Sequence, residues 1–245
     1  MLLVVCSAAG AGVGGLAPVV VYRLAVPFDR PPRSDCPHCG QSLPGGWRGW
    51  LRLAGRCPTC RTPLMAHRWA FPAATASGCA ALAWRLPVSD RAEIVLLVAW
   101  LLLAVVGVVL AGIDLRVNRL PLPLLAVAAA LVSPLVALAA VSGPGLRLLL
   151  HAVVAAAAFG GAYLILALAG PGLVGAGDAY LAALLGLLLG TGPMTGIWAG
   201  AVLPYLLAFP VTAVRLSLGH LERRGQIALG PYLIGGAILA KALIP

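Results

Sequence analysis

Eight long apolar runs, almost free of charged residues, constrain the fold more than any other feature of the sequence. They lie near residues 2–22, 69–86, 94–113, 120–141, 148–169, 179–191, 194–214 and 229–244. Apolar runs of about 18 or more residues predict transmembrane helices, whereas a β-barrel needs segments that alternate in hydrophobicity. With 61% hydrophobic and only 10% charged residues, the chain lacks the polar exterior of a soluble domain. We therefore predict an all-α, polytopic integral membrane protein with about eight transmembrane helices, the sixth of them short.

The only sizeable polar segment lies between the first two runs, and it predicts three parts. These are a first transmembrane helix at 1–22, a small cytoplasmic loop domain at 23–68, and a membrane core of about seven helices at 69–245. The first run has no basic segment before it and is followed by Arg23. A signal peptide normally carries its positive charge ahead of the apolar core, so we expect a retained first span with its N-terminus outside.

The net charge of +10 is distributed unevenly between the two faces that eight spans would create. Thirteen of the 17 basic residues fall on one face, which the positive-inside rule makes cytoplasmic. This distribution favours membrane topology and contact with anionic lipid over nucleic-acid binding as the reason for the charge. The thirteen are Arg23, Arg30, Arg33, Arg48, Arg52, Arg56, Arg61, Arg68, Arg116, Arg119, Arg215, Arg223 and Arg224.

The polar segment contains two cysteine pairs, in "CPHCGQSL" and "CPTCRTPL". Cys36, Cys39, Cys57 and Cys60 form C-x2-C, seventeen intervening residues, and C-x2-C, a spacing typical of a zinc ribbon. Four thiolates leave no coordination position for water, so the predicted zinc is structural rather than catalytic. Two disulfides are the alternative, and a reducing cytoplasm disfavours them. Gly40, directly after the first pair, fits a tight turn.

Two carboxylates stand at the ends of apolar runs. Asp114 ends the third run in "AGIDLRVNRLP", and Asp178 begins the sixth in "GAGDAYL". Two membrane crossings separate them, so both should lie on the same face, near the cytoplasmic boundary. A carboxylate near the bilayer is costly and is therefore a candidate functional group.

Two nearby carboxylates repel each other, so one of them retains its proton. Such a pair suits aspartyl proteolysis, in which the ionised group activates a water and the protonated group polarises the scissile carbonyl. Gly175 and Gly177 would let an extended substrate backbone approach Asp178.

Structural roles for the two aspartates remain open from these residues alone. Asp114 has Arg116 and Arg119 nearby in sequence as ion-pair partners. Asp178 is placed to cap the N-terminus of the sixth helix, where the helix dipole favours an anion. The proteolytic and structural hypotheses are about equally supported, and a metal or ion pathway is less favoured.

Taken in order, these motifs resemble the type IV prepilin peptidases, membrane aspartyl peptidases of the GxGD class. The likeness covers nearly the whole chain: a first span followed by a C-x2-C pair, then "LRLAGRCPTC", "GIDLRVNRLP", "GAGD" and "IALGPYLIGGAIL". The resemblance implies removal of a short basic leader from prepilin or pseudopilin precursors, at the cytoplasmic face of the inner membrane. Asp114 and Asp178 match the catalytic pair of the family. Members often also N-methylate the new N-terminus with S-adenosylmethionine, an activity attributed to the cysteine-bearing region.

Three departures from the family pattern bear on these expectations. Tyr180 stands where the family usually has Lys, no acid occurs between Asp35 and Asp90, and "GGWRGWLRL" replaces the usual segment between the cysteine pairs. The family usually has a Glu entering the second span, so the sequence leaves methylation open. A non-catalytic prepilin-binding membrane protein of the same ancestry is an alternative. An ion or solute transporter is less favoured, because both acids lie at one boundary rather than near the midplane.

Overall fold

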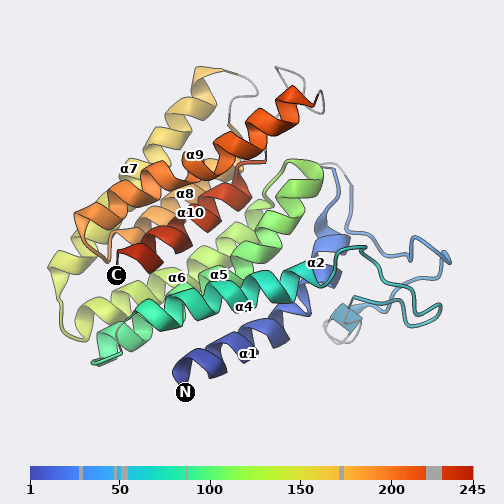
Figure 1. Ribbon diagram of the computed structural model, residues 1–245, viewed down its shortest axis with the longest axis horizontal. Helices are drawn as coiled ribbons and strands as arrows, with labels where there is room; N and C mark the ends of the chain where they lie inside the picture. The colour runs from blue at the N-terminus through green and yellow to red at the C-terminus, as the bar shows by residue number, and fades with distance from the viewer. Residues whose placement is uncertain are drawn as a thin grey trace.

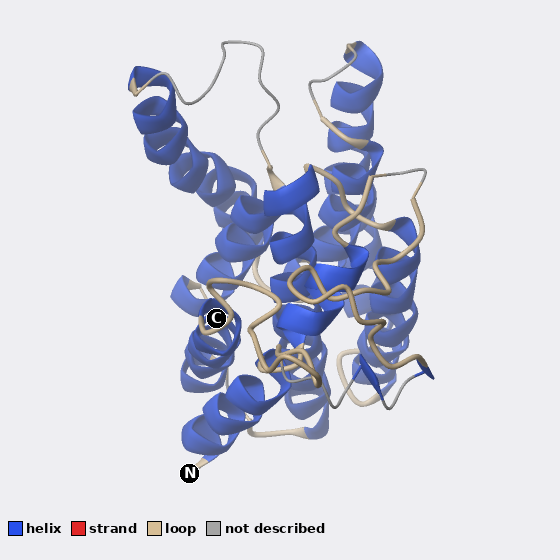
Figure 2. Ribbon diagram, turned by 90° about the vertical axis from the view of Figure 1, so that its right-hand side faces the viewer, coloured by secondary structure: helices blue, strands red, loops and turns tan. Residues whose placement is uncertain are grey.

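In the computed structural model of the chain, residues 1–27, 30–46, 49–50, 55–86, 88–170, 174–218 and 228–244 are described. Within these ranges the regular structure is helical, with two isolated β-bridges (Figure 2). The prediction of an all-α fold is confirmed. Four of the thirteen basic residues counted above lie outside the described residues: Arg48, Arg52, Arg223 and Arg224.

All eight apolar runs contain helix (Figure 1). The helices are α1 (Leu2–Gly14), α2 (Ala17–Leu24), α4 (Ala70–Arg85), α5 (Arg91–Val117), α6 (Leu122–Val141), α7 (Leu146–Ala169), α8 (Ala176–Leu189), α9 (Met194–Ser217) and α10 (Gly230–Leu243). In the described chain, 5 helical segments are long and apolar enough to cross a membrane: Leu2–Leu24, α5, α6, α7 and α9. The other helices, α4, α8 and α10, have 16, 14 and 14 residues. The chain is therefore a multi-pass membrane protein.

The first run, predicted as one helix over 2–22, is divided into α1 and α2. The division falls at Gly15 and Leu16, shortly before Pro18. Proline has no backbone N–H, and its ring crowds the carbonyl four residues earlier, so it suits the first turn of a new helix better than the middle of a long one.

Helices that follow one another in the chain pack side by side as pairs. The pairs are α4 with α5, α5 with α6, α7 with α8, and α9 with α10, while α1 packs on α4. α10 contacts α4, α5, α8 and α9, so it lies at the centre of the bundle (Figure 1). Gly186 and Gly190 allow the close approach of α8 to α7, because an added Cβ would lie 2.6 Å from the Ala155 oxygen and 2.7 Å from the Ala152 Cα, respectively. Glycines four residues apart thus allow close packing of these two apolar helices.

Local capping sets the ends of the two helices that carry the aspartates. Asn118 adopts the left-handed conformation (φ 47°, ψ 49°), and its N–H donates to the Asp114 carbonyl, which ends α5 at Val117. α5 thus continues beyond residue 113, where the prediction ended it, and Asp114 lies in its last turn. α8 begins at Ala176 rather than 179, so Asp178 lies in its first turn. Both boundaries were wrong by about one turn because hydropathy does not report these caps.

The polar segment between α2 and α4 leaves one end of the bundle (Figure 1). In Figure 2, this side faces the viewer and the loops lie over the helices. Val21 of α2, Leu64 and Met65 of the loop, and Ile113 of α5 belong to one buried cluster. Because Ile113 directly precedes Asp114, the cysteine-bearing loop lies at the same end of the bundle as the aspartates.

Candidate functional site

Asp114 is buried, with only 4% of its surface exposed. Its Oδ2 accepts a hydrogen bond of 2.8 Å from the backbone N–H of Gly230, the first residue of α10. The first N–H groups of a helix have no partner within the helix and carry the positive end of its dipole, so a carboxylate is stabilised there. The bond joins the end of α5 to the start of α10. Arg119, one of the two predicted partners of Asp114, donates to the Val26 carbonyl oxygen at 3.1 Å.

Asp178 uses one carboxylate oxygen to cap its own helix. Oδ2 accepts a hydrogen bond of 3.0 Å from the N–H of Gly175, the N-cap residue of α8. The other oxygen, Oδ1, is buried and has no hydrogen-bond partner in the described structure. Buried polar atoms are nearly always paired, so an unpaired one is a candidate for chemistry. The capping hypothesis therefore accounts for one oxygen of Asp178 and not for the other.

The two aspartates lie at the same end of the bundle, as the count of membrane crossings predicted, because the starts of α8 and α10 both approach the turn that follows Asp114. Leu120, in the turn between α5 and α6, contacts the start of both other helices. A Cβ on Gly177 would lie 2.8 Å from Leu120 Cβ, and a Cβ on Gly230 would lie 3.4 Å from Leu120 Cδ2. Gly177 thus lets α8 approach the turn. The predicted role of Gly175 and Gly177 in admitting a substrate backbone remains a prediction.

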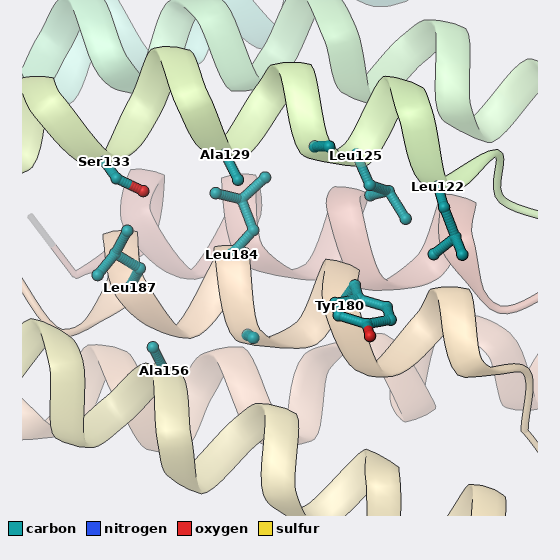
Figure 3. A pocket seen from close by; sticks show the side chains of 10 residues that line it. Leu122, Leu125, Ala129, Ser133, Ala156, Tyr180, Leu184 and Leu187 are labelled. Atoms are coloured by element: carbon teal, nitrogen blue, oxygen red, sulfur yellow. The ribbon is translucent and has the colours of Figure 1, made fainter.

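An apolar groove runs along the face of α8 that carries Ala176, Tyr180 and Ala183, and we call it the lateral groove; neither aspartate lines it. Its larger part is a cavity of about 510 Å³ between α6, α7 and α8 (Figure 3). A second cavity of about 340 Å³ shares Tyr180 and Ala183 with the first and adds Ala176 and Ala179, which lie beside Asp178 in sequence. Tyr180 is 61% exposed and projects into the groove (Figure 3). Because Tyr180 takes the place of the usual family Lys, no charged side chain lines either cavity. The larger cavity, of about 510 Å³, is lined by Leu122, Leu125, Ala126, Ala129, Ser133, Ala156, Tyr180, Ala183, Leu184 and Leu187.

The four predicted zinc ligands come together in the folded loop. The Sγ atoms of Cys36, Cys39, Cys57 and Cys60 all lie within 4.8 Å of one another. The Cys36–Cys60 and Cys39–Cys57 sulfur distances are both 3.8 Å. A tetrahedral zinc with Zn–S bonds of about 2.3 Å requires sulfurs about 3.8 Å apart, so the donor set fits zinc.

The two cysteine pairs form equivalent turns. The N–H of Gly40 donates to the Cys36 carbonyl, and the N–H of Arg61 donates to the Cys57 carbonyl, both at 3.0 Å. Gly40 and Arg61 have positive φ angles of 69° and 56°. The predicted tight turn at Gly40 is thus present, and Arg61 repeats it in the second pair without glycine.

Hydrogen bonds to the sulfurs favour the thiolate form that binds metal. The Thr62 hydroxyl lies 2.8 Å from Cys60 Sγ, and together with the Thr62 backbone N–H it lowers the pKa of Cys60 to about 6. The backbone N–H of Cys60 contributes most to lowering the pKa of Cys57.

Two tyrosines near Asp178 were missed by the sequence analysis. Tyr163 of α7 is buried, and its hydroxyl accepts a hydrogen bond of 2.9 Å from the hydroxyl of Tyr205 in α9. Tyr163 lies three residues beyond Gly160, which approaches the Ala179 oxygen next to Asp178 in α8. Nothing in the local sequence separates the two tyrosines from other interfacial aromatics.

Residues 8–86 match the model of the bacterial peptidase A24 N-terminal domain. The matched range contains most of the first span, the cysteine centre and α4. Fold and match together define the class: a multi-pass membrane protein that carries a peptidase-family domain. The match covers 8–86 of the 245 residues and supports assignment to the type IV prepilin peptidases, the family that the motifs of the chain resemble. The chain matches no curated protein and no solved structure.

Proposed function

We propose that this protein is a membrane aspartyl endopeptidase that removes the short basic leader from type IV prepilin-like precursors at the cytoplasmic face of the inner membrane. The observation that carries the proposal is the pairing of Asp114 with Asp178. They come from different helices to the same end of the bundle, and each has one oxygen held by a backbone N–H. The family match, although it lies outside both aspartates, supports the peptidase class.

The pair performs the hydrolysis as one ionised and one protonated carboxyl group. The ionised group takes a proton from a water molecule as the water oxygen bonds to the scissile carbonyl carbon. The protonated group gives its proton to the carbonyl oxygen, which becomes a hydroxyl. When this intermediate collapses, the hydroxyl proton returns to the carboxylate that gave it and the C–N bond breaks. The leaving nitrogen takes the proton that came from the water.

The lateral groove supports a path for the substrate. An apolar precursor helix can enter from the lipid beside α6 and lie along α8, because the groove is uncharged and leads to Ala179, next to Asp178. The cleavage site at the cytoplasmic end of that helix then reaches the two aspartates, and the leader extends beyond the membrane.

We further propose the three-part organisation expected from the sequence: a first transmembrane helix at 1–22, a zinc-binding loop domain at 23–68 and a peptidase core at 69–245. The zinc stabilises the fold of the loop, since four thiolate ligands leave no open position for a reacting water. Leu64, Met65 and Ile113 belong to one buried cluster, which supports packing of that loop near the segment that carries Asp114.

The test is to mix membranes containing the protein with a synthetic prepilin and measure the mass of the product. Asp114→Asn and Asp178→Asn are each expected to abolish cleavage while the protein still inserts normally. Asp90→Asn is the matched control: Asp90 caps α5 at its other end, and Asn caps a helix equally well, so cleavage should continue.

Full activity of either active-site variant would exclude this mechanism. A wild-type preparation that binds the precursor and never shortens it would favour the non-catalytic alternative. An additional methyl mass on the product would reveal the second activity, with S-adenosylmethionine as the methyl donor.

A further inference from the structure

The unpaired oxygen of Asp178 marks a position where the proposed active site needs a hydrogen-bond donor. Oδ1 is buried and has no partner in the described structure, whereas Oδ2 is already bound to the Gly175 N–H. A carboxylate oxygen has two lone pairs, so Oδ1 can hold a water molecule in the catalytic state. A second donor is then needed to fix the orientation of that water.

The packing of α7 on α8 places Tyr163 opposite Asp178. The two helices run antiparallel, and their contacts form a regular series of close approaches. Gly190 meets Ala152, Gly186 meets Ala155, and Gly160 meets both Ala183 and the Ala179 oxygen.

Tyr163 lies three residues beyond Gly160, on the same face of α7. The antiparallel series therefore continues from Ala179 toward the start of α8, and it brings Tyr163 to the turn that contains Asp178.

The hydroxyl of Tyr163 is already oriented by a neighbour. Tyr205 of α9 donates to it at 2.9 Å, and this bond occupies one lone pair of the Tyr163 oxygen. The proton of Tyr163 remains free to be donated elsewhere. A water molecule between the Tyr163 hydroxyl and Oδ1 can accept the proton of Tyr163 in a hydrogen bond and donate one to Asp178.

We propose that Tyr163, oriented by Tyr205, donates a hydrogen bond to the attacking water and holds it against Oδ1 of Asp178. Tyr163 is thus a further catalytic residue of the aspartyl peptidase, and the inference rests on the proposed function. The water gives one hydrogen to Oδ1, accepts the Tyr163 proton at one lone pair, and attacks the carbonyl carbon with the other.

This arrangement assigns the roles within the pair. Asp178 is the ionised, water-activating carboxylate, because Gly175 and the bridged water both donate to it. Asp114 then holds the proton that moves to the carbonyl oxygen. The water proton passes to Asp178 as the O–C bond forms, and Tyr163 keeps its own proton throughout.

Few other ionisable side chains lie on the described parts of the helices that surround Asp178. Asp114 of α5 lies at the same end of the bundle as Asp178, α6 carries no ionisable side chain, and Lys241 contacts Gly192 at the opposite end of α8. The further ionisable side chains on helices packed against α8 are Arg147 and His151 of α7, Arg215 of α9 and Tyr232 of α10.

The kinetic test compares three Tyr→Phe variants on the prepilin substrate. Tyr163→Phe is expected to lower kcat about 10- to 100-fold with KM changed by less than about twofold, because it removes a donor used only during water attack. Tyr205→Phe should lower kcat by a smaller factor, about threefold to tenfold, since it removes only the orientation of that donor. Tyr22→Phe is the control: it loses a comparable hydrogen bond, to the Asp35 carbonyl at 2.7 Å, within the loop region. Its kcat should match that of the wild type.

A spectroscopic test separates this inference from the proposed function, because it needs no precursor. Infrared difference spectra recorded over a pH titration show the carboxyl band of Asp178, identified by its loss in Asp178→Asn. In Tyr163→Phe the protonation midpoint of that band should move to higher pH by about half to one unit, because the anion has lost a donor through its water. Tyr22→Phe should leave the midpoint unchanged.

An unmoved midpoint in Tyr163→Phe, or a variant that cleaves at the wild-type kcat, would overturn the inference even if the protein is a peptidase. A shifted midpoint in a protein that never cleaves would support the link between Tyr163 and Asp178 and refute the proposed peptidase function instead.

Discussion

Replacing Gly230 by Ala tests whether a single backbone N–H controls the position of Asp114. Gly230 begins α10, and its N–H donates to Asp114 Oδ2 at 2.8 Å. A Cβ at this position would lie 2.8 Å from the same Oδ2 and 3.4 Å from Leu120 Cδ2. The added methyl group therefore has the carboxylate on one side and the α5–α6 turn on the other.

The expected loss follows from that distance. A carbon and an oxygen without a bond prefer a separation of at least about 3.3 Å, so the carboxylate or the start of α10 must move by about half an ångström. The hydrogen bond then lengthens beyond the usual range of about 2.7–3.2 Å. A hydrogen bond between neutral groups, here the Gly230 N–H and the protonated Asp114, contributes about 0.5–1.5 kcal/mol, and each 1.4 kcal/mol corresponds to about tenfold in rate. We therefore expect kcat for leader removal to fall about 2- to 10-fold.

The assay is cleavage of a synthetic prepilin by the purified protein in lipid vesicles, followed by product mass. Gly235→Ala in the same helix is the matched control, because its Cβ would meet only Leu207 Cδ1 at 3.9 Å, an ordinary contact. This variant should cleave like the wild type and gain up to about 1 kcal/mol in helix stability. If Gly230→Ala also cleaves at the wild-type rate while Asp114→Asn is inactive, the Gly230 N–H does not position the catalytic carboxylate.

Three other predictions concern the metal centre, the helix packing and the lateral groove. The wild-type protein should contain one zinc per chain by elemental mass spectrometry, and Cys57→Ser should lose it, because one of four thiolates is gone. Gly190→Ala brings a Cβ to 2.7 Å from a backbone atom of α7, so its thermal unfolding should show a loss of about 1–3 kcal/mol. Gly143→Ala, with nothing within 4 Å, should show no such loss. Ala126→Trp fills the groove and should raise KM for the precursor about tenfold at unchanged kcat, whereas Ala130→Trp on α6, which does not line the groove, should not.

Apolar composition was sufficient to predict the helices, because each transmembrane segment satisfies its backbone hydrogen bonds internally whatever it packs against. The ends of the helices were harder to predict. α5 ends at the left-handed Asn118 and α8 begins at the Gly175 cap, and both lie about one turn outside the boundaries that hydropathy gave. Those two turns contain Asp114 and Asp178, so the functional residues lie where the prediction was weakest.

The residues of the two sites also differ in how well the sequence predicted them, and the difference depends on whether their contacts are local in the sequence. The four cysteines were predictable because their spacing is itself the signature of the metal site. The shared end of the aspartates followed from counting membrane crossings. The Gly230 donor was not predictable, because its bond is a tertiary contact: Asp114 and Gly230 are 116 residues apart. Their pairing depends on how α10 packs against α5, which no periodicity in the sequence records.

Leu120 explains why the two aspartates come together although α5 and α8 are separate helices. It lies two residues after Asn118, in the turn that begins once α5 has ended. Gly177 approaches Leu120 from α8 and Gly230 approaches it from α10, and a Cβ on Gly177 would be only 2.8 Å from Leu120 Cβ. A side chain at 177 would push the first turn of α8, and Asp178 with it, away from Asp114. Gly177 is therefore needed to keep the two carboxylates close to each other, because the start of α8 must pack directly on the turn that follows Asp114.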